Sequence, residues 1–201
     1  MFGTDIRGRA ISLLRPLISP VEPIVTRVPI GSTVLDIGCG VGVVLFRLLK
    51  RGRAVSGLGW DVSEDAIHTA RRLAQKRAVP SSLRFESVTG GVTLPSGRFG
   101  CVLLIDVMHH VAPRSQTDFL SECLTKVGEK GTFVYKDMAS APRWKAQLNR
   151  LHDYIFSGDE ISYYPLEDVK KVCQGQGFKL MDEAHYSRFF YAHELLVFVR
   201  E

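Results

Sequence analysis

The sequence predicts an α/β domain with a doubly wound, mostly parallel sheet, and three observations lead to this fold class. Short runs rich in β-branched residues alternate with stretches that have helical spacing. A glycine-rich turn follows the first of these runs, and the length of 201 residues suits a single core. Strands separated by helices need crossover connections, so we expect parallel strands with helices on both faces of the sheet.

The expected strands and helices follow one another in order along the chain. The β-like runs are 33–37, 54–60, 83–88, 101–107 and 132–136. Helical spacing occupies 43–50, 64–77 and 116–127. A further helix is expected at 166–175, followed by the runs 178–184 and 194–200, which we expect to close the sheet as an antiparallel hairpin.

Two segments fall outside this alternation. Residues 1–30 begin with an amphipathic basic stretch, which we interpret as an extra helix packed on the sheet, with a lid or a membrane-surface helix within residues 1–20 as alternatives. Residues 31–201 would form the main domain. Within it, about 139–164 is an aromatic-rich insertion, interpreted equally as a substrate-pocket wall or as a separate hydrophobic cluster.

Composition limits the class of protein. The net charge of +5 permits an anionic partner, but the basic residues are scattered, so there is no strong nucleic-acid signal. No apolar run is long enough to cross a bilayer, and prolines and arginine interrupt the N-terminal stretch. The four cysteines form no Cys-x-x-Cys pair, so we expect no metal site and a cytoplasmic protein.

The stretch "VLDIGCGVG" at 34–42 is interpreted as a ligand-binding loop at the end of a strand. Gly38, Gly40 and Gly42 are two residues apart, whereas a dinucleotide fingerprint reads G-x-G-x-x-G, so NAD is disfavoured. Asp36 adds a carboxylate that would repel a pyrophosphate and attract an ammonium group.

With "GWDVS" at 59–63, "IDVMHHV" at 105–111 and "GEKGTFVYKD" at 128–137, this loop resembles the class I S-adenosylmethionine-dependent methyltransferases. The resemblance covers 31–138. It implies a seven-stranded Rossmann-like sheet whose last strand is antiparallel, and S-adenosylmethionine as cofactor across the carboxyl ends of the first strands.

The resemblance also implies roles for residues at the cofactor. The loop residues Gly38, Cys39, Gly40 and Gly42 would shape the backbone against the methionine and ribose portions, while Asp36 would help to fix the loop and the amino group. Asp61 would accept hydrogen bonds from both ribose hydroxyls, and its alternative role is an N-cap, which Asp61 or Ser63 could supply.

Adenine recognition departs from the usual family pattern. Val62 is expected to pack on the adenine. Thr89 stands where an acidic residue commonly reads the adenine amino group, and Gly100 stands where an aspartate is common. These two departures predict weaker cofactor binding and leave a non-catalytic S-adenosylmethionine-binding protein as an alternative.

Asp106 and the two histidines after it stand where methyl donor and acceptor would meet. His109 or His110 is a candidate general base, since imidazole titrates near neutrality, and the alternative is a histidine that only fixes the loop. The pattern "DVMHHV" resembles members that methylate small molecules and lacks the Asn/Asp-Pro-Pro-Tyr signature expected for nucleobase or amide nitrogen.

The expected function is therefore methyl transfer by in-line displacement to a small, apolar or aromatic acceptor, with an RNA methyltransferase as a second alternative because of the basic pI. Asp137 is a further candidate to face the pocket. The sequence leaves open the acceptor, the methylated atom and the oligomeric state. The candidates for acceptor binding are His152, Tyr163, Tyr164 and His193.

Overall fold

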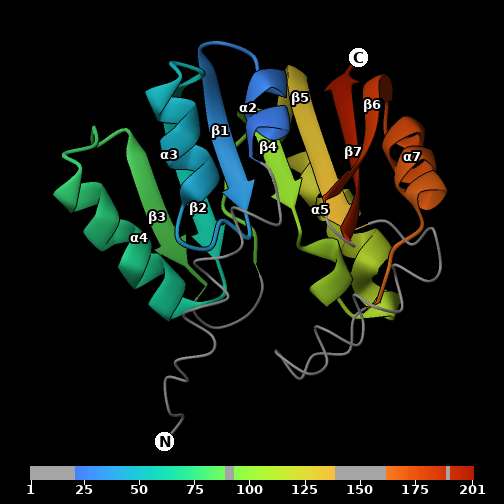
Figure 1. Ribbon diagram of the computed structural model, residues 1–201. Helices are drawn as coiled ribbons and strands as arrows, with labels where there is room; N and C mark the ends of the chain where they lie inside the picture. Colours follow the sequence, from blue (N-terminus) through green and yellow to red (C-terminus); the bar gives the residue numbers. More distant parts are fainter. Residues whose placement is uncertain (1–20, 89–92, 139–161, 189–190) are drawn as a thin grey trace, which may run out of the picture.

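The structure is a computed structural model that describes residues 21–88, 93–138, 162–188 and 191–201 (Figure 1). Its centre is a seven-stranded sheet in the order β3-β2-β1-β4-β5-β7-β6. Strands β1 to β5 are parallel, and β7 pairs antiparallel with β5 and with β6. The strands are β1 Ser32–Ile37, β2 Ala54–Asp61, β3 Leu83–Ser87, β4 Phe99–Ile105, β5 Val127–Met138, β6 Phe178–Arg188 and β7 Tyr191–Arg200.

Helices cover both faces of the sheet, which confirms the doubly wound fold. Buried residues of α2, α3 and α4 form one core cluster with one face, and those of α5 and α7 form a second cluster with the other. Figure 1 shows the two helical layers on opposite sides of the strands. The helices are α2 Glu22–Arg27, α3 Val43–Lys50, α4 Glu64–Lys76, α5 Gln116–Thr125 and α7 Leu166–Gly175, with short 3-10 turns η1 Met108–His110 and η2 Pro113–Ser115.

Most predicted strand boundaries differ from the structure by one to five residues, with the hairpin strands longer than the expected 178–184 and 194–200, and the backbone explains two of the differences in β4 and β5. The strand expected at 101–107 ends at Ile105, because Asp106 adopts a left-handed conformation with φ of +54° that stops the extended chain. The strand expected at 132–136 begins at Val127, which pairs with Phe99 before the register shifts. Charged residues in this first part of β5 hid its strand character.

The start of the predicted N-terminal extension lies outside the described residues. The structure describes it from residue 21, where α2 follows. Ile24, Val25 and Val28 are buried at 2% exposure or less, so this part packs on the sheet with α3. Among the described residues, no helix is long and apolar enough to cross a membrane.

The topology places the ends of several strands along one edge of the sheet. In a parallel sheet all carboxyl ends lie on one side, which is the lower edge in Figure 1. Strand β7 runs the other way, so its first residues lie beside the last residues of β5, with His193 opposite Met138. The ends of β2, β1, β4 and β5 and the start of β7 are therefore neighbours along this edge, and the carboxyl edge holds most of the predicted site residues.

Candidate functional site

The glycine loop after β1 depends on conformations that side chains rarely adopt. Gly38, Gly40 and Gly42 have φ values of +75°, +53° and +81°. A Cβ added at Gly42 would lie 2.5 Å from the Phe85 ring, and one at Gly38 would collide with the side chain of Val107. The loop therefore presents bare backbone at the edge and packs directly against the end of β4.

Asp61, the last residue of β2, fixes this loop. Its Oδ2 accepts a hydrogen bond of 2.7 Å from the Gly40 amide, and its Oδ1 accepts one of 2.8 Å from the Ser63 amide. The N-cap of α4 is Ser63, whose hydroxyl accepts from the Ala66 amide at 3.2 Å, so the capping role belongs to Ser63. Each carboxylate oxygen of Asp61 keeps a second lone pair for a ligand hydroxyl.

Asp36 is a buried carboxyl beneath the same loop. It is 2% exposed, and its Oδ2 has no hydrogen-bond partner among the described residues. Burial, and then the nearby charge of Asp61, raise the pKa of Asp36 to about 8. A buried carboxyl with an orphaned oxygen fits a cationic ligand group, which would supply the missing partner.

For the other residues predicted at the cofactor, the structure gives no contact that points to a ligand. Cys39 lies in the loop, and burial followed by the charges of Asp36 and Asp61 raises the pKa of its thiol well above the ordinary value, so it is an unreactive thiol. Val62 is 64% exposed at the edge, which leaves its surface open to an apolar ligand. Thr89 lies outside the described residues.

Asp106 and Lys136 form an ion pair at the ends of β4 and β5. The Lys136 side chain is fully buried, and its Nζ lies 2.6 Å from both carboxylate oxygens of Asp106. The Asp106 amide also donates to the Lys136 carbonyl at 2.8 Å. Burial opposes ionisation of Asp106, but the ammonium of Lys136 outweighs it and lowers the pKa of the carboxyl below its ordinary value.

His109 and Asp137 form a second pair on the opposite side of β5. The Nδ1 of His109 lies 2.5 Å from Oδ1 of Asp137, and the His109 amide donates to Oδ2 at 3.2 Å. The two residues are 5% and 4% exposed. A neutral imidazole that donates from Nδ1 carries its lone pair on Nε2, so this contact orients His109 to accept a proton there.

The turn that carries His109 is anchored by a side chain that the sequence did not single out. Gln116, at the start of α5 and 3% exposed, donates through Nε2 to the carbonyls of Met108 and Ser162, at 3.0 Å each. The Ser162 amide donates to the His109 carbonyl at 3.1 Å. The turn is thus tied to the residue that follows segment 139–161.

The remaining predicted acceptor residues are brought together only in part. His110 is exposed and its ring lies 4.1 Å from that of His109. His193 is 3% exposed at the start of β7, where its ring contacts Tyr186. The Tyr164 hydroxyl pairs with Thr117 at 2.9 Å, which places it against α5, and Tyr163 is half-buried beside it. His152 lies outside the described residues.

Lys136 and Tyr186 contact the predicted site residues Asp106 and His193, and the sequence reasoning singled out neither of them. Lys136 stands in "FVYKD", where a charged pair ends an otherwise apolar central strand, and this is a usable signal because such a strand is normally uncharged. Tyr186 reaches the site only through the β6–β7 pairing, which no local pattern indicates. Among the described residues, no group of three or more His, Cys, Asp or Glu side chains is arranged to hold a metal ion.

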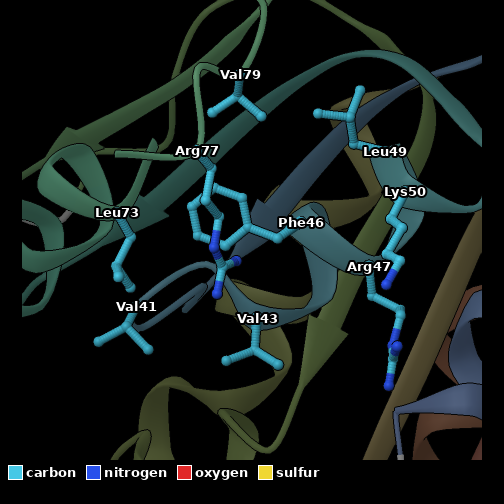
Figure 2. Close-up of a pocket in the computed structure, with 9 residues that line it drawn as sticks. All are labelled: Val41, Val43, Phe46, Arg47, Leu49, Lys50, Leu73, Arg77 and Val79. Atoms are coloured by element: carbon cyan, nitrogen blue, oxygen red, sulfur yellow. The ribbon is translucent and has the colours of Figure 1, made fainter. Parts of the chain in front are cut away.

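A groove of about 630 Å³ lies between α3 and α4 and includes Val41 of the glycine loop. Figure 2 shows Arg77 stacked over the Phe46 ring in its middle, with the guanidinium carbon 4.7 Å from the ring centroid. The carboxyl-edge acids and His109 do not line this groove. Its lining residues are Val41, Val43, Phe46, Arg47, Leu49, Lys50, Leu73, Arg77 and Val79.

Comparison with known proteins agrees with this geometry. Residues 8–183 match the family model described as a methyltransferase domain. The magnesium protoporphyrin IX methyltransferase from Synechocystis PCC 6803 with bound SAH superposes with a TM-score of 0.75 at 20% identity, covering 100% of this chain and 90% of that one. At this identity the likeness shows the fold.

Two curated relatives match over part of their length. The release factor glutamine methyltransferase of Agrobacterium fabrum is 28% identical over 165 residues, which cover 76% of this chain and 52% of that protein. The ubiquinone biosynthesis O-methyltransferase of Methylobacterium sp. is 35% identical over 82 residues, 41% of this chain and 32% of that protein. The chain thus spans about half and about a third of these relatives. The family match covers most of the chain, and the chain belongs to the class I S-adenosylmethionine-dependent methyltransferases.

Proposed function

We propose that the chain transfers the methyl group of S-adenosylmethionine to a hydroxyl group of a small, apolar or aromatic acceptor. The observation that carries this proposal is the His109–Asp137 pair at the carboxyl edge. A hydroxyl is a weak nucleophile until its proton leaves, and an imidazole held in one tautomer by a carboxylate is suited to take that proton. A carboxylate acceptor would need no such base.

The chain's residues divide the work between two parts of the edge. The glycine loop and Asp61 would hold the ribose and methionine portions of the cofactor, and Asp36 would face its ammonium group. The cofactor supplies a methyl group on a sulfonium, so the acceptor oxygen bonds to the methyl carbon while the carbon–sulfur electron pair returns to sulfur. His109 Nε2 takes the hydroxyl proton, and Asp137 stabilises the resulting imidazolium.

The class of acceptor is supported by the end of β4 and by one relative. The sequence there reads "IDVMHHV", and it lacks the Pro-Pro-Tyr signature of amide and nucleobase methylation. The Methylobacterium relative is named an O-methyltransferase of ubiquinone biosynthesis. An apolar phenol fits both the base and the need for a dry site.

The test is turnover of S-adenosylmethionine to S-adenosylhomocysteine with a panel of phenols, amines and carboxylic acids, with structured RNA as a further arm. Phenols should be methylated, with kcat/KM rising through the pH range in which imidazole titrates. The His109→Gln variant should lose about 10²- to 10⁴-fold in kcat. The matched control is His110→Gln, an exposed neighbour whose loss should change kcat by less than about threefold, as is usual for surface substitutions. An equal loss of kcat in the two variants would show that His109 is not the general base.

A further inference from the structure

Burial of the Lys136–Asp106 ion pair costs free energy of folding. Lys136 is 0% exposed, and a lysine removed from water loses hydration that an ion pair seldom repays in full. Asp106 also holds a left-handed backbone at φ +54°, which disfavours a residue with a side chain. Hydrophobic residues would give the end of β4 and β5 at least equal stability. The pair therefore needs a functional explanation.

Its position joins the two parts of the carboxyl edge. Asp106 precedes Val107, whose side chain fills the space beside Gly38 in the glycine loop. It also lies three residues before His109, whose charge acts on it. Among the described residues, five around Asp106 carry titratable groups that influence it or are influenced by it: Lys136, His109, His193, Tyr135 and Tyr186.

The charges of the edge match those of the cofactor. The Lys136–Asp106 pair is neutral as a whole, but the Lys136 side chain is fully buried and the Asp106 side chain is 22% exposed, so the negative end of the pair is the one open to a ligand. A sulfonium carries one positive charge, and its thioether product carries none on sulfur. If His109 takes a proton as the methyl group leaves, the charge lost at sulfur is replaced on the imidazole, so the total charge of the dry site stays constant.

We propose that Lys136 is a positioning residue that holds Asp106 as an ionised carboxylate between the glycine loop and His109, and that this charge makes the site prefer the sulfonium cofactor to its thioether product. The proposal rests on cofactor binding at this edge and not on the acceptor. Lys136 acts through Asp106 and does not touch the reacting atoms.

The experiment compares the dissociation constants of S-adenosylmethionine and S-adenosylhomocysteine by calorimetric titration between pH 6 and 9. In the unaltered protein Asp106 should stay ionised over this range, so the preference for S-adenosylmethionine should change only as far as His109 and His193 titrate. In Lys136→Met, burial without the ammonium should keep Asp106 protonated near neutrality. The preference should then fall about tenfold at pH 6 to 7 and return toward pH 9.

Two further variants separate this role from a structural one. Asp106→Asn should lose the preference at every pH, and it supplies the baseline for any titration of His109 and His193. The double variant Lys136→Met/Asp106→Asn carries no charge at either position, so its preference should match that of Lys136→Met at pH 6 to 7 and should stay at that value up to pH 9. If Lys136→Met does not fold, Asp106→Asn alone decides the matter by losing or keeping the preference.

Equal weakening of both ligands at all pH values in Lys136→Met would overturn the proposal, as would an unchanged preference in Asp106→Asn. The readout needs no acceptor. A failure to methylate phenols would therefore reject the hydroxyl acceptor and leave the role of Lys136 and Asp106 untouched. An unchanged preference in Asp106→Asn would reject that role and leave the hydroxyl acceptor untouched.

Discussion

The two parts of the carboxyl edge are built in different ways. At β1 and β2 the cofactor part consists of backbone: three left-handed glycines and amides held by Asp61. At β4 and β5 the acceptor part consists of side chains, with the proposed base pair His109–Asp137 on one face of β5 and, on the other, the Asp106–Lys136 pair that joins it to the cofactor part. Under the proposed function, the difference teaches that the cofactor would be held by a fixed turn, while the acceptor chemistry would rest on a few side chains.

The largest effect is expected when the cofactor part is broken at Asp61. In Asp61→Ala the loop loses its Gly40 contact, and the ribose hydroxyls lose their acceptor. Two hydrogen bonds to a charged group correspond to a loss on the order of 10²- to 10⁴-fold in affinity for S-adenosylhomocysteine. Calorimetric titration measures it, with exposed Asp65→Asn as the matched control. Retained micromolar affinity would show that backbone alone holds the cofactor.

A substitution at Asp137 should lower turnover without weakening cofactor binding. Asp137→Asn cannot accept the Nδ1 proton in the same way, so His109 loses its preferred tautomer and the imidazolium loses its stabilising charge. The kcat should fall roughly 10- to 10³-fold while S-adenosylhomocysteine affinity changes little. Steady-state kinetics and titration on one preparation check both. A parallel fall in affinity would mean that the two parts are not separable.

The protonation of Asp36 should make cofactor affinity depend on pH, and this dependence is expected of the cofactor part alone. The pKa of about 8 leaves Asp36 mostly protonated at pH 7, whereas a bound ammonium favours the ionised form. Binding at pH 7 should release up to about one proton, and affinity should rise up to about fiftyfold from pH 6 to 8 and level off above. Titration in buffers of different ionisation enthalpy measures the release.

Asp36→Asn is the control, and it should show less proton release and a flatter pH dependence, since titration of the ligand's own amine is common to both proteins. Its stability should also differ in pH dependence. The folded-state pKa of Asp36 is raised from 3.8 to about 8, so the cofactor-free wild type loses stability as pH rises through that window, and the variant does not. Identical proton release in the two proteins would contradict a role for Asp36.

The smallest effect is expected at the helix cap beside Asp61. Ser63→Ala removes the hydroxyl that accepts from Ala66, which should cost about 1 kcal/mol of unfolding free energy and leave cofactor affinity within about threefold. Denaturant unfolding and titration separate the two effects. A large loss of affinity would show that Ser63 also serves the ligand.

The sequence indicated which residues lie together better for the cofactor part than for the acceptor part, and the reason is physical. Loop 38–42 and Asp61 belong to contiguous motifs, and glycine spacing records the backbone conformation directly. The pairs of the acceptor part join residues about thirty positions apart, since His109 meets Asp137 and Asp106 meets Lys136 only through the β4–β5 register. Either histidine was a candidate base, and only the contact with Asp137 separates His109 from His110.

Element boundaries follow the same logic. The helix predicted at 166–175 was confirmed because its apolar spacing is local and regular. The early start of β5 was missed because Gly128, Glu129 and Lys130 do not resemble a strand, and pairing with Phe99 at Val127 overrides them. Pairing with β4 therefore extends β5 to Val127, although the local sequence does not favour a strand there.

The most direct test of the division between the two parts is a single calorimetric titration of the His109→Gln variant with S-adenosylhomocysteine, on protein whose turnover of a phenol has been measured. We predict wild-type affinity within about threefold together with a kcat reduced at least about 10²-fold. Loss of cofactor affinity in proportion to turnover would contradict the account, because His109 would then belong to the cofactor part.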